Sequence, residues 1–169
     1  MIHPKPSQVF VYGTLKRGQC REKLWPLTPL SVTTGWIHAE LFGRSDYPAI
    51  RAGGDRVLGE VWRFTSEEIS LVLRELDQIE GFNQPKESDL YHRRSVEVFS
   101  PQGQSLGECH CYFYAADPLK DGFHRITPKS VPLGQVPLRS PVGIPISFND
   151  LAMGDGAVFV QWPEVDGRE

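Results

Sequence analysis

One amphipathic helix is predicted in this chain, and it stands among segments that have the pattern of strands. In residues 66–80, apolar side chains recur at the 3- and 4-residue spacing of one helical face. Thr65 and Glu68 have the spacing of a capping box at the start, and Gly81 supplies the left-handed residue that commonly ends a helix. The apolar face consists of Ile69, Val72, Leu73, Leu76 and Ile79. The sequence therefore predicts a helix that ends at Glu80.

Strands outnumber helices in the prediction. Residues 57–64, 91–99 and 107–115 are predicted as strands, and the helix lies between the first two of them. The apolar run at residues 9–11 adds a short buried strand near the start of the chain. This order of elements favours a mixed α+β domain over a wound parallel sheet.

Glu80 is a candidate for proton transfer. It lies four residues after Leu76, on the apolar face of the helix and in its last turn. Apolar surroundings and the negative end of the helix dipole both disfavour an ionised carboxylate. Both effects raise the pKa of Glu80 from its ordinary value of about 4.3 towards neutrality, where a carboxyl group can accept and return a proton.

Glu80 also has a plain structural interpretation. A last-turn acid can swing out to water, or it can pair with Arg93 or Arg94, and helix geometry alone leaves this alternative open. Three other acidic residues lie off the face formed by Val72, Leu76 and Glu80, and we expect them to be solvated: Glu67, Glu75 and Asp77.

The segment that follows the first strand is a candidate binding loop. Residues 9–11 lead directly into a turn at Gly13, and the backbone amides of such a turn can hold an anion. The spacing of Gly13 and Gly18 is that of a phosphate loop, but Gln19 stands where such a loop has lysine, so nucleotide binding is disfavoured. An ordinary tight turn remains the alternative.

Several strings together make the chain resemble the gamma-glutamylcyclotransferase-like family. They occur in the family's usual order and span roughly residues 8–115, and the first is closest in wording to the gamma-glutamylamine cyclotransferase branch. The strings are Val-Phe-Val-Tyr-Gly-Thr-Leu-Lys-Arg-Gly-Gln at 9–19, Tyr-Pro-Ala-Ile at 47–50, Val-Leu-Gly-Glu-Val-Trp at 57–62, Leu-Asp-Gln-Ile-Glu-Gly at 76–81 and Tyr-His-Arg at 91–93.

The resemblance carries implications for fold and site. It implies a small closed or nearly closed mixed β-barrel with flanking helices, and a pocket where the loop and the helix end meet. It implies that Glu80 is the catalytic acid/base, which agrees with the helix argument. It also implies a substrate-binding set made of backbone amides and one lining aromatic residue: Tyr12, Gly13, Thr14, Leu15 and Tyr114.

The reaction implied by the resemblance requires no metal and no cofactor. The α-amine of a γ-glutamyl group attacks its own side-chain amide, which releases 5-oxoproline and an amine or amino acid. A non-catalytic protein that binds a small acidic metabolite in the same pocket is the alternative, and a hydrolase that releases glutamate is a third. The chain departs from the amine-specific branch at residues 20–23, which read Cys-Arg-Glu-Lys in place of that branch's usual Asn-His.

Composition excludes some partners. The net charge of −3 comes without a basic stripe, so nucleic acid is not expected as a partner, and Lys16 and Arg17 are predicted to be solvated. The first residues lack the apolar run of a signal peptide, and three cysteines cannot all pair, so we expect a cytoplasmic protein without membrane contact. Cys109 and Cys111 are predicted to face one side of a strand as buried apolar residues, with His110 on the other side.

We expect one domain over residues 1–169. Residues 8–115 form its family-like catalytic core, and residues 116–169 form a proline- and glycine-rich extension that packs on this core. Within the extension, the apolar run at residues 158–162 is expected to add an edge strand or cover the barrel. Residues 83–89 are predicted as a polar loop that either covers the pocket or merely connects two elements. The sequence makes no prediction of oligomeric state.

Overall fold

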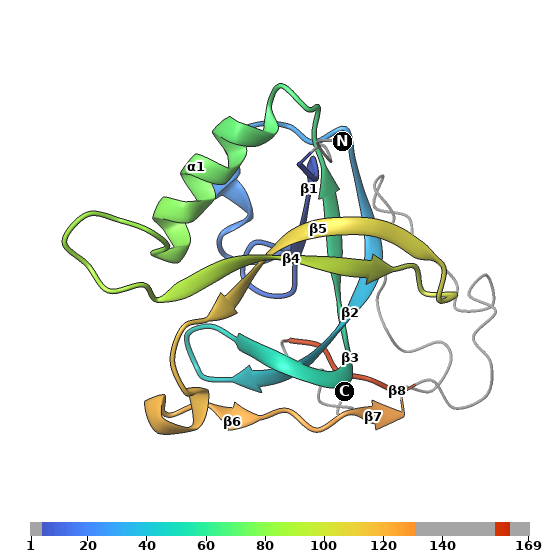
Figure 1. The fold of residues 1–169 in the computed structure, drawn as a ribbon. Coiled ribbons are helices and arrows are strands. Elements are labelled where there is room, and N and C mark those ends of the chain that lie inside the picture. The colour runs from blue at the N-terminus through green and yellow to red at the C-terminus, as the bar shows by residue number, and fades with distance from the viewer. Residues whose placement is uncertain (1–4, 131–157, 163–169) are drawn as a thin grey trace.

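Five strands close into a barrel, and one α-helix packs against the outside of it (Figure 1). The computed structural model describes residues 5–130 and 158–162. The helix α1 spans Ile69–Glu80 and is the single α-helix among these residues. The barrel strands are β1 (Gln8–Val11), β2 (Ser31–Gly43), β3 (Ala49–Arg63), β4 (Tyr91–Phe99) and β5 (Ser105–Tyr114).

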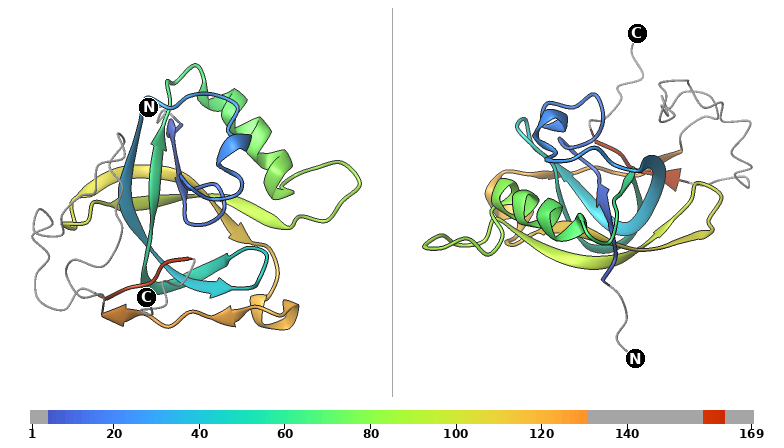
Figure 2. Two further views of the ribbon diagram at one scale, coloured as in Figure 1. Left: turned by 180° about the vertical axis from the view of Figure 1, so that it is seen from behind. Right: turned by 90° about the horizontal axis from the view of Figure 1, so that it is seen from above.

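The strands lie in the order β3-β1-β5-β4-β2, and the pairing of β2 with β3 closes the circle. Neighbouring strands are antiparallel except β1 and β5, which are parallel. The predicted α+β class and the small mixed barrel are thus confirmed. The views from behind and from above show α1 on one side of this barrel (Figure 2).

Alternation along β1 separates two apolar layers. Phe10 and Tyr12 belong to the cluster inside the barrel, whereas Val9 and Val11 belong to the cluster beneath α1. Successive side chains of a strand point to opposite faces, so one short strand contributes to both layers. The expected buried strand at residues 9–11 is present, and its position explains why no polar residue interrupts it.

Short elements complete the described chain. They are the 3-10 helices η1 (Glu22–Leu24) and η2 (Pro118–Asp121) and the two-residue strands β6 (His124–Arg125), β7 (Lys129–Ser130) and β8 (Val158–Phe159). The strand β6 pairs with β2, and β7 pairs with β8.

The helix begins later than predicted. Residues 66–68 form a turn, and the regular helix starts at Ile69. The capping box is formed all the same: the Thr65 N–H donates to the Glu68 carboxylate at 3.3 Å, and the Glu68 N–H donates to the Thr65 hydroxyl at 3.2 Å. Gly81 adopts the left-handed conformation with φ 65°, as predicted.

The strand β2 was not predicted, and β3 begins eight residues before the predicted strand at 57–64. The hairpin of β2 and β3 is the most extensive pairing in the barrel, with twelve residue pairs and one register shift after Ala39. Three consecutive residues of β2, at positions 35–37, are buried, and so are those at 41–43. Burial on both faces removes the polar–apolar alternation by which a strand is recognised in a sequence.

The cysteine prediction is confirmed. Cys109 and Cys111 are fully buried inside the barrel, and the His110 ring nitrogen Nε2 lies 2.8 Å from the Pro6 carbonyl oxygen on the other side. Among the described residues, no group of three or more His, Cys, Asp or Glu side chains is placed to hold a metal ion. No helix in residues 5–130 or 158–162 has the length and apolar character needed to cross a membrane.

The apolar run near the C-terminus packs on the barrel. Phe159 and Val160 are buried, and Val160 joins the cluster inside the barrel. The Leu58 N–H donates to the Val160 carbonyl at 2.9 Å, and the Val160 N–H donates to the Arg56 carbonyl at 2.9 Å. This segment therefore extends the sheet beside β3, in agreement with the prediction for residues 158–162. Residues 131–157 and 163–169 of the predicted extension lie outside the described residues.

Contact between β1 and β3 depends on a glycine. A Cβ atom at Gly59 would meet the Val11 carbonyl oxygen and lie 2.5 Å from the Phe10 ring. We expect Gly59→Ala to lower the free energy of unfolding by about 1–3 kcal/mol, because the packed ring has no space to move into. Gly54→Ala in the same strand is the control, since nothing lies within 4 Å of its added Cβ. Urea denaturation of both variants measures the effect, and equal stability would contradict this account of the barrel.

Candidate functional site

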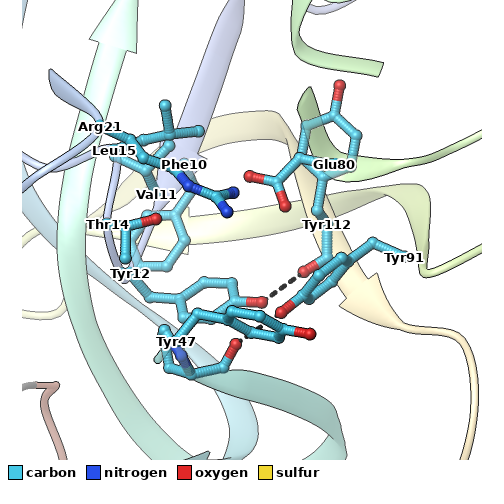
Figure 3. A pocket seen from close by; sticks show the side chains of 12 residues that line it. Phe10, Val11, Tyr12, Thr14, Leu15, Arg21, Tyr47, Glu80, Tyr91 and Tyr112 are labelled. Atoms are coloured by element: carbon cyan, nitrogen blue, oxygen red, sulfur yellow. Dashed lines mark hydrogen bonds between the residues drawn. The ribbon is translucent and has the colours of Figure 1, made fainter. Parts of the chain in front are cut away.

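A cavity lies between the loop after β1 and the last turn of α1 (Figure 3). The empty space of the cavity together with the solvent at its opening amounts to about 390 Å³. The lining residues come from β1, the loop after it, the β2–β3 connection, α1, β4 and β5. They are Phe10, Val11, Tyr12, Gly13, Thr14, Leu15, Arg21, Tyr47, Pro48, Glu80, Tyr91 and Tyr112. The structure thus brings the predicted loop and Glu80 to one cavity.

The loop residues form the buried part of the cavity wall. Tyr12, Thr14 and Leu15 are each less than 10% exposed. Within the described chain, the N–H groups of Gly13, Thr14 and Leu15 donate no hydrogen bond. A buried N–H group without an acceptor is costly, so these three amides are suited to an anionic ligand.

Gly13 is required for a different reason from the one predicted. The sequence suggests a turn that needs glycine, but the positive backbone φ angle in this loop occurs at Gly18. At Gly13, an added Cβ would lie 2.5 Å from Pro48 Cγ. The glycine therefore allows the β2–β3 connection to pack against the loop.

Contacts to the barrel hold the loop in place. The Arg17 N–H donates to the Glu60 carboxylate at 2.8 Å, and the Arg17 side chain pairs with the same group at 3.2 Å. The Trp25 ring N–H donates to the Leu15 carbonyl at 2.9 Å, and the Trp25 ring stacks on Trp62. These contacts hold the loop at Leu15 and Arg17, next to the amides of residues 13–15, so these amides are preorganised.

Lys16 and Arg17 are not the solvated charges that the sequence suggests. Arg17 is engaged by Glu60, and its side chain is only 17% exposed. Lys16 donates to the Trp162 carbonyl oxygen of the C-terminal segment. Burial lowers the pKa of the Lys16 ammonium to about 8. Long-range packing against β3 and residue 162 buries both side chains.

Glu80 lies across the cavity from the loop, at the end of α1. Burial raises its pKa to about 7, and the positive charge of Arg21 opposes this rise. Arg21 and Glu80 point toward one another in the cavity (Figure 3). Arg93, one of the partners considered for Glu80, instead pairs with Asp77 at 3.3 Å. A carboxyl group with this pKa exchanges protons readily near neutral pH.

Three tyrosines form the wall next to Glu80, and their hydroxyl groups are directed into the protein. The Tyr12 hydroxyl donates to the Tyr112 carbonyl at 2.7 Å, and the Tyr91 hydroxyl donates to the Pro48 carbonyl at 2.7 Å. Burial is the largest cause that raises the pKa of each of these phenols, and the charge of Glu80 contributes. These phenols therefore remain neutral in the pH range in which Glu80 titrates.

Asp77 is not a solvated helix charge as predicted. The Tyr112 hydroxyl donates to its carboxylate at 2.6 Å, and Arg93 pairs with the same oxygen. Burial raises the pKa of Asp77, while these two partners oppose the rise. Asp77 thus ties α1 to β5 and β4 one turn before Glu80, and it fixes the position of the helix end.

Tyr114 does not line the cavity. Its hydroxyl donates to the Asp121 carboxylate at 2.6 Å, and its ring packs against Phe123 and Tyr91. The tyrosine two residues earlier, Tyr112, lines the cavity instead. Residues 83–89 contribute nothing to the lining either, and the loop projects beyond the end of α1 (Figure 1).

Sequence reasoning missed four polar lining residues. Tyr91 and Tyr112 fall within the predicted strands at 91–99 and 107–115, but strand patterns do not tell which side chain faces a cavity. Tyr47 lies in the β2–β3 connection, and β2 was not predicted. Arg21 belongs to the segment 20–23, which the sequence had marked only as a departure from one branch of the family.

One solved structure shares this fold, and two others are matched with lower scores. An AIG2-like protein from Mus musculus is 26% identical with a TM-score of 0.52, and the alignment covers 71% of this chain and 85% of that one. The protein ytfP from Escherichia coli is 25% identical with a TM-score of 0.45, over 70% and 90% of the two chains. YkqA from Bacillus subtilis is 22% identical with a TM-score of 0.49, over 71% of this chain and 37% of its own.

The present chain thus corresponds to little more than a third of YkqA. A search among curated proteins found no match. The family described as "Gamma-glutamyl cyclotransferase, AIG2-like" matches residues 9–130, which include β1, the loop, α1 and the strands β2 to β7. This match covers most of the sequence and contains every residue that lines the cavity. The chain belongs to the gamma-glutamyl cyclotransferase, AIG2-like family.

Proposed function

We propose that this protein is a cyclotransferase that converts a γ-glutamyl conjugate into 5-oxoproline and a free amine or amino acid. The observation that carries the proposal is the pKa of Glu80, raised to about 7 by burial in a cavity that is also lined by Gly13, Thr14 and Leu15, whose N–H groups donate no hydrogen bond within the described chain. Perturbed carboxyl groups in cavities are typical of acid/base catalysis. Family membership supports the same reaction class.

In this proposal, the loop after β1 binds the α-carboxylate of the substrate. Gly13, Thr14 and Leu15 are buried residues, their N–H groups donate no hydrogen bond within the described chain, and the loop is held by contacts to the barrel. An α-carboxylate bound there places the rest of the γ-glutamyl chain in the cavity, within the reach of Glu80. A bent substrate brings its α-amine to its own γ-carbonyl, and the intramolecular attack gains from this proximity.

In this proposal, Glu80 carries out both proton transfers, one from the attacking amine and one to the departing nitrogen. As the α-amine attacks, a carbon–nitrogen bond forms, and the amine proton passes to the Glu80 carboxylate. The carbonyl oxygen becomes an oxyanion, for which N–H groups of the same loop are the assigned donors. As the oxyanion collapses, the bond to the departing nitrogen breaks, and Glu80 returns the proton to that nitrogen. No water, metal or cofactor is consumed in these steps.

A protein that only binds a small acidic metabolite is the other candidate. Such a binder gains nothing from a second carboxylate next to the bound anion, because the two negative charges repel each other. The placement of Glu80 opposite the loop amides therefore favours the enzyme.

Glu80→Gln should abolish most turnover. The amide keeps the shape of the side chain but transfers no proton, so we expect 5-oxoproline formation to fall by about 10²- to 10⁴-fold. Mass spectrometry measures this product after incubation with γ-glutamyl amines, γ-glutamyl amino acids and glutathione. Glu67→Gln is the matched control, because Glu67 is exposed in the turn before α1 and lines no part of the cavity.

The outcomes separate the candidates. Product from wild type and from Glu67→Gln but not from Glu80→Gln supports the proposal. Free glutamate in place of 5-oxoproline would indicate a hydrolase. Binding of the conjugates without any product would leave the binding protein as the function.

The pKa of Glu80 also predicts how stability changes with pH. Glu80 titrates at about 7 in the folded protein and at about 4.3 when unfolded. Between these values the folded state holds the extra proton, so wild-type stability falls as the pH rises. Glu80→Gln lacks this loss, and we expect its stability relative to wild type to rise by about 2.5 kcal/mol between pH 5 and pH 8. Urea denaturation at both pH values measures it, and a pH-independent difference would show that Glu80 titrates normally.

A further inference from the structure

Arg21 is the one cationic side chain among the residues that line the cavity. Its backbone is fixed to the loop: the Arg21 N–H donates to the Thr14 carbonyl at 2.9 Å, and the Leu24 N–H donates to the Arg21 carbonyl at 2.9 Å. The proposed mechanism gives Arg21 no task, since the loop amides hold the α-carboxylate and Glu80 moves the protons.

The Arg21 guanidinium has its donors available. In residues 5–130 and 158–162, no carboxylate lies within 4 Å of it, and no side-chain hydrogen bond joins it to another group. Its charge acts on Glu80 from across the cavity. A guanidinium with five N–H donors at the wall of a cavity matches the two oxygens of a carboxylate.

The depth of Arg21 in the cavity indicates which carboxylate of the substrate it binds. The wall formed by Tyr12, Gly13 and Thr14 is buried, whereas Arg21, Tyr47 and Glu80 are partly exposed. A γ-glutamyl group bound to the loop amides fills the buried part and presents its amide bond to Glu80. In this orientation, the portion of the substrate beyond that bond extends toward the partly exposed lining residues, one of which is Arg21.

We propose that Arg21 determines specificity by binding a carboxylate on the departing portion of the substrate. The preferred substrates are then γ-glutamyl amino acids or short γ-glutamyl peptides, in place of γ-glutamyl conjugates of neutral amines. This inference rests on the proposed function, because it takes the orientation of the substrate from the loop amides and Glu80.

Two ligands of the same shape test the inference. In γ-glutamyl-alanine the departing portion ends in a carboxylate, and in γ-glutamyl-alaninamide it ends in a neutral carboxamide. A charge-assisted hydrogen bond separates such a pair by about 10- to 100-fold. We expect kcat/KM of the wild type to favour the acid by this factor, and Arg21→Gln to reduce the acid-to-amide ratio by about the same factor.

The ratio isolates recognition from other effects. Loss of the positive charge also raises the pKa of Glu80 in the empty cavity, but this change cancels in the ratio of kcat/KM values because both substrates bind the same free enzyme. Lys23→Gln is the matched control, since it removes an equal charge from an exposed residue of η1 that lines no part of the cavity. It should retain the wild-type ratio. Arg21→Lys keeps the charge without the planar fork, and it should retain part of the preference.

Equal losses for both substrates in Arg21→Gln would overturn the inference, because they would place Arg21 on the α-carboxylate that the two ligands share. A wild-type ratio near one would overturn it as well. Absence of 5-oxoproline from both ligands would refute the proposed function separately. In that case, calorimetric dissociation constants of the same two ligands test the role of Arg21. Tighter binding of the acid by the wild type, lost in Arg21→Gln, supports the assignment, and equal binding of the two ligands by the wild type overturns it.

Discussion

The position of β1 between β3 and β5 is the constraint on which the rest of the structure depends. This four-residue strand pairs on both sides, supplies Phe10 to the barrel interior and supplies Val11 to the layer beneath α1. Gly59 permits the approach of β3 that this arrangement requires. Because both layers fix β1, the loop that follows it leaves the barrel at one place only, next to the end of α1.

Burial is the largest cause of the raised pKa at the site. Glu80 receives its raised pKa from desolvation, and Arg21 offsets part of that effect. Desolvation in turn requires that α1 end where it does, and Asp77 anchors this end through Tyr112 and Arg93. The pKa of Glu80 is therefore set by the same contacts that attach the helix to the barrel, so stability and pKa are coupled in this region.

The features that the sequence predicts are those set by neighbours along the chain. The helix, its capping box and the place of Glu80 follow from spacings of three and four residues. The strand β2 could not be predicted because burial on both faces removes its alternation. The burial of Asp77 likewise depends on Tyr112, 35 residues away in the sequence. Local periodicity carries no information on such contacts.

In the proposed function, substrate recognition and proton transfer are linked through the charge of Arg21. Arg21 lowers the pKa of Glu80 in the empty cavity. A carboxylate bound to Arg21, as proposed for the departing portion of the substrate, offsets that positive charge and lets the pKa of Glu80 rise again. Glu80 then holds the proton of the attacking amine more firmly, until the departing nitrogen, a stronger base once its bond breaks, takes it. The substrate that pairs with Arg21 thus adjusts the acid that releases its own departing group.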